Sequence, residues 1–372
     1  MTLKRRDFVK TTTAGLALAA GSASFPKPAI SQGKLKWRMV TTWPKNFPGL
    51  GTGANLLAEL IGRMSDGRLE VEVYGAGEIV PAFESMDAVS GGTVEMGHGA
   101  PYYWKGKVPA SQFIASLPFG LTAQEQNAWF YYGGGQELAD EVYAQMNAKF
   151  FPSGNTGVQM GGWFNKEIHS LKDYEGLKMR IPGLGGEVVK AAGGVVVNLP
   201  GGEIMPALES GSIDATEWVG PYNDLAFGFY KVAKYYYYPG WHEPATVLDC
   251  FINLDAWNAL PDDLKAIIEA ANRAVNVSVL SEFQARNNDS LDQLIKKHGV
   301  VLKRFPDEVL NGLGRLAGEV LTELANQDPL SRKVFDSILE FRRKAISWAK
   351  VSEQSYMTAR LLPFEYAKPS AG

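Results

Sequence analysis

An arginine lies within one predicted strand, and a glutamate lies at the end of another. Arg180 lies between two apolar residues in the predicted strand 178–182, so its side chain points to the opposite face from theirs. The glycine-rich helix start at 183–186 favours anions through its free N–H groups. Glu217 and Trp218 close the next predicted strand, and open α/β sheets place ligands beyond the carboxyl ends of their strands. These positions predict a site for a small anion.

The guanidinium of Arg180 suits a small carboxylate. A carboxylate that is buried in a cleft loses its hydration, and two parallel charge-assisted hydrogen bonds from an arginine fork recover most of that free energy. Lysine cannot present the same planar geometry. The residues alone leave an alternative, in which Arg180 forms a structural ion pair with Glu175 or Glu187.

Two tyrosines follow another predicted strand. The segment 100–104 comes directly after the strand predicted at 94–97, so Tyr102 and Tyr103 lie near a strand end and could donate a hydroxyl to a carboxylate. The alternative is that these aromatic side chains only pack.

The order of elements predicts an α/β protein with more than one domain. The predicted elements at the start of the chain are strands at 35–42, 69–74 and 94–97 and helices at 54–64 and 84–90. This alternation predicts a parallel sheet with crossover helices. A length of 372 residues exceeds the usual size of a single core and suggests two domains. Residues 158–164 are expected to form a strand that crosses between the lobes, and 256–297 a helical region with a break near 287–288.

Three segments resemble the solute-binding proteins of tripartite ATP-independent periplasmic (TRAP) transporters. They are the run LKDYEGLKMRIP at 171–182, the helix with Glu203 and ALESG at 207–211, and IDA at 213–215. The rest of the chain after residue 31 fits this family in order and length. The pairing of Glu217 and Trp218 with the later Glu243 is most similar to the branch that binds 2-oxo acids or lactate with a metal ion.

The resemblance implies an α/β, two-lobed periplasmic binding protein. Parallel-rich sheets flanked by helices would form the lobes, with a cleft between them and a long C-terminal helix. Lobe 1 is expected to comprise residues 34–157 plus about 244–280, and lobe 2 residues 158–243 plus about 281–328. The chain of this family crosses repeatedly between lobes, so continuous blocks of sequence do not correspond to domains.

The resemblance also implies how the site is divided. The acid would be bound by Gln159, Arg180, Tyr102 and Tyr103, and a metal ion by Gln159, Glu217, the Trp218 carbonyl and Glu243. The alternative for Gln159 is a side chain at a strand edge that faces water.

A count of charges favours a cation in this site. Two glutamates and an acid ligand bring three negative charges against one arginine, and burying that set without a cation would force a carboxyl group to protonate. Oxygen ligands suit sodium or calcium, whereas zinc prefers nitrogen and sulfur. The single cysteine, Cys250, is predicted to be a core residue and allows no intramolecular disulfide. His242 precedes Glu243 but lacks the second histidine of a metalloprotease helix.

The expected function is that of a receptor rather than an enzyme. Such a receptor would capture a 2-oxo or 2-hydroxy monocarboxylate, such as pyruvate, 2-oxobutyrate or lactate, and deliver it to a membrane permease. One alternative is a receptor for a larger acid, a sugar acid or C4-dicarboxylate, that needs no metal. The other is a periplasmic enzyme that uses Glu217 or Glu243 as a general base. The sequence shows neither an activated nucleophile with a base nor a dinucleotide fingerprint to support it.

The first 31 residues predict export to the periplasm. They contain the twin-arginine pattern KRRDFVK at 4–10, followed by a weakly apolar segment too short to span a bilayer. Without residues 1–31, which hold five Lys or Arg and one Asp, the 37 basic and 40 acidic residues become 32 and 39, a net charge of −7. An acidic protein is a poor partner for nucleic acid.

The tail, residues 329–362, is predicted to be one long helix. Its apolar stripe has spacings of 4, 3, 4 and 3 and consists of Val334, Ile338, Phe341, Ala345 and Trp348. That interval is typical of helices that pack against a partner. We expect a homodimer formed through this helix, and the alternative is that the helix packs on its own lobe.

Overall fold

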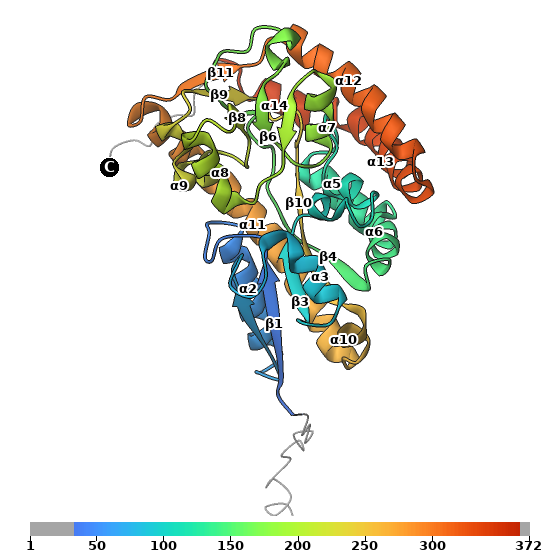
Figure 1. Ribbon diagram of the computed structural model, residues 1–372. Helices are drawn as coiled ribbons and strands as arrows, with labels where there is room; N and C mark the ends of the chain where they lie inside the picture. The colour runs from blue at the N-terminus through green and yellow to red at the C-terminus, as the bar shows by residue number, and fades with distance from the viewer. Residues whose placement is uncertain (1–32, 365–372) are drawn as a thin grey trace, which may run out of the picture. The chain divides into compact units, whose positions relative to one another are not determined.

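Two mixed β-sheets flanked by helices make up the chain from Leu35 onward (Figure 1). The computed structural model describes residues 33–364. The predicted export segment, residues 1–31, lies outside this range. Sheets covered by helices agree with the predicted α/β class.

The first sheet has five strands in the order β2-β1-β3-β10-β4. They are β1 (Leu35–Thr41), β2 (Leu69–Tyr74), β3 (Met96–Gly99), β4 (Ala148–Asn155) and β10 (Val247–Asn253). β1 is parallel to β2 and β3, with α2 (Gly51–Met64) and α3 (Ser85–Ser90) in the crossovers, as the alternation of elements predicts. β10 is antiparallel to β3 and β4 because the chain enters it from the second sheet. All seven residues of β10 are buried, which confirms Cys250 as a core residue.

The second sheet has six strands in the order β11-β9-β5-β8-β6-β7. They are β5 (Gly162–Phe164), β6 (Lys178–Arg180), β7 (Val195–Val197), β8 (Ala215–Thr216), β9 (Tyr235–Tyr238) and β11 (Val301–Arg304). β6 is parallel to β7 and β8, whereas β5 is antiparallel to β8 and β9. The sheet is thus parallel at its flanks and antiparallel around β5, where the chain arrives from the first sheet.

Two extended segments run side by side between the sheets, and we name them the connecting segments. Residues 156–161 lead from β4 to β5, and residues 239–246 lead from β9 back to β10. The predicted crossing strand at 158–164 is therefore regular only over its last three residues. Gly240 N–H donates to the Gln159 carbonyl at 2.9 Å. Only glycine fits at 240, because a Cβ there would lie 2.3 Å from that carbonyl oxygen.

Hydrogen bonds between the connecting segments continue along both of them. Thr156 N–H donates to the Thr246 carbonyl at 3.1 Å, and Gln159 N–H donates to the Glu243 carbonyl at 3.2 Å. The strands of the first sheet fall within the predicted lobe 1 and those of the second within the predicted lobe 2. The lobe boundaries themselves stay a prediction.

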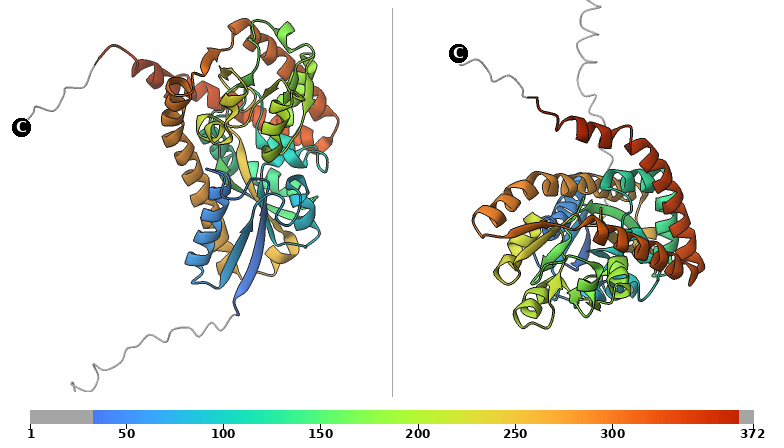
Figure 2. Two further views of the ribbon diagram at one scale, coloured as in Figure 1. Left: turned by 60° about the vertical axis from the view of Figure 1, so that its left-hand side comes forward. Right: turned by 90° about the horizontal axis from the view of Figure 1, so that it is seen from above.

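A long helix, α11 (Asp262–Lys296), is the third connection between the sheets. It packs against β4 and α2 of the first sheet and also against α9 (Pro221–Phe227), and Figure 2 shows it as the long orange helix. The predicted break near Asn287 is wrong. The helix is interrupted earlier, after α10 (Leu254–Asn258), where Pro261 precedes the first turn of α11. Asn287 instead accepts a hydrogen bond from Tyr222 N–H at 3.0 Å through its side-chain oxygen.

The remaining helices cover the outer faces of the sheets. They are α4 (Ser111–Ala115), α5 (Ala123–Tyr132), α6 (Gly135–Ala144), α7 (Gly183–Ala191), α8 (Gly201–Glu209) and α12 (Asp307–Asn326). None of the helices in residues 33–364 combines the length and apolar character needed to cross a membrane. Two hydrophobic cores each draw side chains from both sheets, one including Phe150 and Met179 and the other Met39 and Trp163. The two sheets are therefore packed together and not only tethered.

The C-terminal helix is broken, contrary to the prediction of one helix over 329–362. The tail consists of α13 (Pro329–Ala349) and α14 (Glu353–Ala359). Ser352, with φ −110° and ψ −105°, leaves the helical region between them. Val334 and Ile338 of the predicted stripe are buried on the protein's own chain, whereas Trp348 is 69% exposed. Phe341 and Ala345 are half-buried and pack against the same core, so the stripe packs internally up to Ala345 and leaves Trp348 at its end exposed.

Candidate functional site

Parallel pairing of β6 with β8 brings Arg180 and Glu217 together. Arg180 ends β6 opposite Thr216, and Glu217 N–H donates to the Arg180 carbonyl at 3.2 Å. Nη1 of Arg180 donates to Glu217 Oε1 at 2.5 Å and to the Glu217 carbonyl at 3.2 Å. Both side chains are buried. The two residues therefore meet at the carboxyl ends of parallel strands. The sequence places Glu217 there, whereas it places Arg180 inside a strand predicted to run to 182, and β6 ends at Arg180.

The partner of Arg180 differs from both residues considered in the sequence. It is Glu217 rather than Glu175 or Glu187, and Glu187 pairs with Lys105 at 2.8 Å. Glu217 lies one strand away from Arg180 in space, although 37 positions separate them in the chain. The pair depends on the strand order, which the spacing of charged residues along the chain does not show.

The guanidinium of Arg180 keeps one nitrogen without a partner. Nε donates to the Leu199 carbonyl at 3.0 Å, Nη1 is engaged by Glu217, and the Trp218 ring lies 5.0 Å from the guanidinium carbon. Nη2 is buried and has no hydrogen-bond partner among the described residues. A fork of two parallel bonds to a ligand, as the sequence suggested, is not available here because Nε and Nη1 are already used. Nη2 remains as the donor.

His242 completes the environment of Glu217, and sequence reasoning missed it. Its Nε2 lies 3.3 Å from Glu217 Oε2, and its Nδ1 is buried without a partner among residues 33–364. Possible ligand atoms of Glu217, His242 and Glu243 all lie within 4.8 Å of one another. The position of His242 beside Glu243 in the chain was the available signal. A pair of histidines on one helix is a different metal-binding pattern, and its absence says nothing of a single histidine beside two glutamates.

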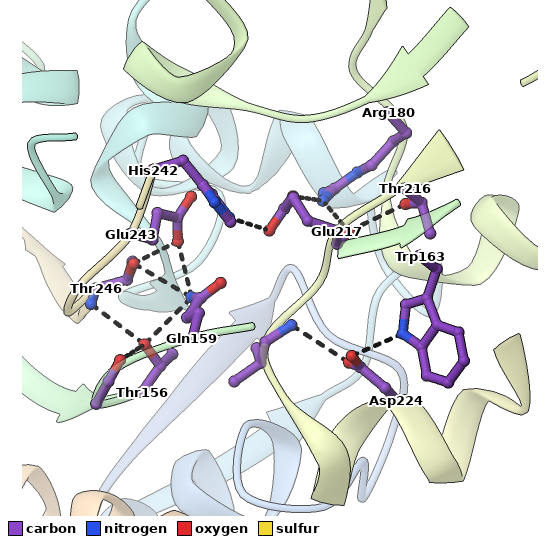
Figure 3. A network of polar contacts seen from close by, with 12 residues as sticks. Thr156, Gln159, Trp163, Arg180, Thr216, Glu217, Asp224, His242, Glu243 and Thr246 are labelled. Atoms are coloured by element: carbon purple, nitrogen blue, oxygen red, sulfur yellow. Dashed lines mark hydrogen bonds and ion pairs between the residues drawn. The ribbon is translucent and has the colours of Figure 1, made fainter. Parts of the chain in front are cut away.

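Gln159 and Glu243 face each other from the two connecting segments (Figure 3). Gln159 Nε2 donates to Glu243 Oε2 at 2.8 Å, to Thr156 Oγ1 at 3.2 Å and to Thr246 Oγ1 at 3.3 Å. The Thr246 hydroxyl donates to the same oxygen of Glu243. Gln159 is 2% exposed, so the alternative of a side chain facing water is wrong, and its Oε1 is buried with no partner in the described chain.

Burial of two carboxylates close together shapes the electrostatics of the site. Burial and, to a smaller extent, the negative charge of Glu217 raise the pKa of Glu243 to about 7, while His242, Thr246 and Arg180 oppose the rise. The structure thus supports the prediction that a second carboxylate beside Glu217 is costly without a compensating proton or cation. The charge count from the sequence did not include His242, whose side chain belongs to the same cluster.

The atoms around Glu243 fit a hard cation. Carboxylate oxygens of Glu217 and Glu243 belong to one cluster, and the amide of Gln159, which is hydrogen-bonded to Glu243, has its Oε1 free. Oxygen donors of this kind suit sodium or calcium. An unpartnered amide oxygen in a buried position is the atom that a cation would satisfy.

The tyrosines of the 3₁₀ helix Pro101–Trp104 border the same region. Burial raises the pKa of Tyr103 to about 12, and the nearby charge of Arg180 limits the rise. Tyr102 packs against the start of α7, where a Cβ on Gly183 would lie 3.1 Å from the Tyr102 Cβ. A small cavity lies between the tyrosines and the connecting segments, and it is lined by Trp43, Leu50, Tyr102, Tyr103, Thr156, Gln159, Trp218, Val219 and Leu248. One part of its wall is polar and the other apolar.

Contacts across the cavity join the elements of the two sheets. Asn223 Nδ2 donates to the Pro48 carbonyl at 2.9 Å, and Asn223 Oδ1 accepts from the indole of Trp218 at 3.3 Å. Phe47 stacks on Phe227 with ring centres 4.3 Å apart. These contacts join the loop after β1 to Trp218 and α9.

Comparison with known proteins assigns the chain to one family. The model of the bacterial extracellular solute-binding protein family 7 (DctP) matches residues 39–328. The monocarboxylate 2-oxoacid-binding periplasmic protein of Nostoc sp. is 42% identical over 360 residues, which cover 95% of this chain and 98% of that protein.

Two solved structures are similar in fold and sequence. A TRAP periplasmic solute-binding protein from Pseudoalteromonas atlantica, with bound sodium and pyruvate, is 43% identical, covers 89% of this chain and 100% of its own, and gives a TM-score of 0.86. A TRAP solute-binding protein from Bordetella bronchiseptica, a mixed-occupancy dimer with copurified calcium and picolinate in one site, is 40% identical, covers 88% and 98%, and gives a TM-score of 0.87. The resemblance found in the sequence is thereby confirmed: the chain belongs to the DctP family of solute-binding proteins that serve TRAP transporters.

Proposed function

We propose that this receptor binds a small 2-oxo or 2-hydroxy monocarboxylate, such as pyruvate, 2-oxobutyrate or lactate, together with a sodium or calcium ion. The observation that carries the proposal is the pair of buried atoms without partners, Arg180 Nη2 and Gln159 Oε1, on either side of two carboxylates. The first is a donor for an anion and the second an acceptor for a cation. The pyruvate and sodium of the Pseudoalteromonas relative support the same combination.

The cation would be held by protein oxygens. We assign these to the Gln159 side chain, the carboxylates of Glu217 and Glu243, and the Trp218 carbonyl. When bound, the cation supplies the positive charge that lets both carboxylates stay ionised in a buried site. It would also attract the carboxylate and the 2-oxo or 2-hydroxy oxygen of the acid.

The acid would be held on its other side by Arg180 and the tyrosines. Arg180 Nη2 is buried and free to donate, and Tyr103 lies close enough for its pKa to respond to the charge of Arg180. Tyr102 and Gln159 line the same cavity. The apolar part of the wall, with Leu50, Val219 and Leu248, would face the short carbon chain of the ligand.

Isothermal titration calorimetry tests this proposal directly. The protein without residues 1–31, stripped of copurified ligand by unfolding and refolding, is titrated with pyruvate, 2-oxobutyrate and lactate in sodium, in calcium, or in chelator with potassium. We expect tight binding that requires one of the two cations and is lost in Glu243→Ala. Binding that ignores cations and survives Glu243→Ala would favour a receptor for a larger acid. The recovered acid is examined by mass spectrometry, because conversion of the ligand would favour an enzyme.

We further propose that residues 1–31 export the protein to the periplasm by the twin-arginine route, and that lobe closure delivers the acid to the TRAP permease. The pattern at 4–10 supports the first part and the family supports the second. Replacing Arg5 and Arg6 by lysine should leave the protein in the cytoplasm, as measured by fractionation. Replacing Lys4 and Lys10 by arginine keeps the charge outside the pair and serves as the control.

The end of the tail supports a homodimer. Exposed apolar side chains gather on the last turn of α13, on α14 and beyond, and they are Trp348, Val351, Tyr356, Met357, Leu361, Leu362 and Phe364. A concentration of this kind marks an interaction site. A second copy of the chain is the partner that the dimer from Bordetella supports.

Light scattering after size exclusion measures this association. Trp348→Glu with Val351→Glu should give a monomer where the unmodified protein gives a dimer. Val277→Glu, at an apolar residue on α11 that is 61% exposed, is the matched control and should leave the mass unchanged. An unmodified protein that is monomeric at all concentrations would contradict the proposal.

A further inference from the structure

The amide of Gln159 has one orientation that the surrounding hydrogen bonds allow. Its Nε2 faces three oxygen atoms, belonging to Glu243, Thr156 and Thr246, at 2.8–3.3 Å. An amide turned the other way would place its carbonyl oxygen against those same atoms. Whether that is tolerable depends on where the two threonine hydroxyl protons lie.

Both hydroxyl protons are already engaged elsewhere. The Thr246 hydroxyl donates to Glu243 Oε2, and the Thr156 hydroxyl donates to the Gly157 carbonyl at 3.0 Å. Thr156 Oγ1 also accepts from Thr246 N–H at 3.2 Å. A threonine hydroxyl has one proton and two lone pairs, so each oxygen can offer Gln159 only an acceptor. The third neighbour, the carboxylate of Glu243, is an acceptor when ionised.

These three oxygen atoms can therefore form hydrogen bonds only with the NH₂ group of the Gln159 side chain. The carbonyl oxygen must point the opposite way, and Oε1 is indeed the buried atom with no partner in the described chain. We propose that Thr156 and Thr246 are positioning residues that hold Gln159 with its oxygen toward the cation. The inference rests on the proposed function and assigns roles that neither the motifs nor the resemblance suggested.

The same threonines tie the site to the connecting segments. Thr156 follows β4 directly and Thr246 directly precedes β10, so each stands where a connecting segment leaves the first sheet. Their backbones are hydrogen-bonded to each other at 3.1 Å. Through these two hydroxyls, the alignment of the connecting segments determines how the two proposed cation ligands, Gln159 and Glu243, are oriented (Figure 3).

The test compares variants that lack one threonine hydroxyl but keep the side-chain shape with variants that keep the hydroxyl. Thr156→Val and Thr246→Val remove the acceptor and keep the shape, whereas Thr156→Ser and Thr246→Ser keep the hydroxyl. Thr42→Val is the control, because Thr42 is buried and its hydroxyl has no partner among residues 33–364. Calcium and sodium are titrated calorimetrically at saturating pyruvate, and the Tm of the protein without cation or ligand is measured in parallel.

We expect each valine variant to weaken cation binding by roughly 10- to 100-fold, the range typical of residues that orient metal ligands. The serine variants should bind within about threefold of the unmodified protein, and Thr42→Val should bind as tightly as it. The side-chain hydrogen bond that Thr156 makes to a proposed cation ligand is the one to Gln159, so in a Gln159→Leu background Thr156→Val should cause no further loss of cation affinity. A merely structural role would give additive losses and no rescue by serine.

Two results would overturn the inference while leaving the receptor intact. One is cation affinity unchanged in both valine variants while the unmodified protein requires the cation. The other is an additional loss from Thr156→Val when Gln159 is already leucine. Binding of pyruvate without any cation in the unmodified protein would instead remove the proposed function, and this inference with it.

Discussion

Asp224 and Glu243 are two buried carboxyl groups that differ in their surroundings (Figure 3). The two oxygens of Asp224 accept from Trp163 Nε1 at 2.9 Å, the Tyr236 hydroxyl at 2.7 Å and Val219 N–H at 3.4 Å. Burial raises the pKa of both carboxyl groups to about 7. A perturbed pKa therefore does not separate the two.

The neighbours of the two groups do separate them. Both carboxylate oxygens of Asp224 accept hydrogen bonds, so this group holds α9 against β5 and β9. Around Glu243 three buried atoms have no partner among the described residues, namely Gln159 Oε1, Arg180 Nη2 and His242 Nδ1. Such atoms cost free energy unless something satisfies them. A satisfied buried carboxyl is a structural feature, and one among unsatisfied neighbours marks a binding site.

Removing the arginine should have the largest effect. Arg180→Met leaves Glu217 buried without its partner, and loss of one member of a buried charge pair in an interface costs about 2–5 kcal/mol. We expect pyruvate affinity to fall at least about thirtyfold, measured by calorimetry. Arg332→Met, at a surface arginine that pairs with Asp336, is the control and should bind normally. Normal binding by Arg180→Met would place the anion elsewhere.

Amide replacements at the two carboxyl groups test the comparison itself. Asp224→Asn places an NH₂ group among three donors and should lower the free energy of unfolding by about 1–3 kcal/mol without changing cation dependence. Glu243→Gln removes a charge that burial disfavours and a ligand of the cation, so it should lose cation-dependent pyruvate binding with little loss of stability. Chemical unfolding and calorimetry on both variants decide it. The opposite assignment of effects would show that Asp224 belongs to the site.

The pH dependence follows from the raised pKa of Glu243, about 7 against an ordinary 4.5. A pKa raised in the folded state means that folding disfavours the ionised form, so the protein without cation loses stability as pH rises from about 4.5 to 7. A cation requires the ionised form and must displace a proton below pH 7, where its affinity should fall up to about tenfold per pH unit. The increase in Tm caused by calcium with pyruvate should therefore be larger at pH 8 than at pH 5.5. Glu243→Gln should show no such difference.

The smallest expected effect concerns two tyrosines, one beside each carboxyl cluster. Tyr103→Phe should weaken pyruvate binding about two- to tenfold and leave stability nearly unchanged, because its hydroxyl serves the ligand. Tyr236→Phe removes a donor to Asp224 and should lower the free energy of unfolding by about 1 kcal/mol with unchanged binding. If both variants bind normally, Tyr103 has only a packing role.

The strand-end residues were predictable because local pattern decides them. The alternation of elements places Glu217 at the carboxyl end of one strand and Arg180 within another, and the structure brings both to the carboxyl ends of parallel strands because β6 ends at Arg180. The meeting of Gln159 with Glu243 depends on hydrogen bonds between segments 84 positions apart, which no local pattern encodes, and only the family resemblance suggested it. His242 and the threonines were missed because their roles arise from hydrogen-bond partners rather than from spacing.

The helices show the same limit. Pro261 indicates the start of α11, because proline has no N–H to donate and is tolerated best at the first turn of a helix. The sequence-based prediction instead placed a break at two asparagines. Asn287 lies within the helix because its side chain accepts a hydrogen bond from Tyr222 N–H. This tertiary contact outweighs the tendency of an asparagine side chain to bond to its own backbone outside helices. The break at Ser352 carried no comparable signal, since no proline or glycine stands there.

The hydrogen-bonded connecting segments have a kinetic consequence. Gln159 and Glu243 are fixed to each other by the backbone bond between those segments, whereas Arg180 and Glu217 belong to the second sheet. When the sheets move apart, the first pair would keep its spacing and the second pair would travel away. The cation would then find half of its ligands already assembled in the open receptor and could arrive before the acid. The order of loading would be a property of the connecting segments rather than of either lobe.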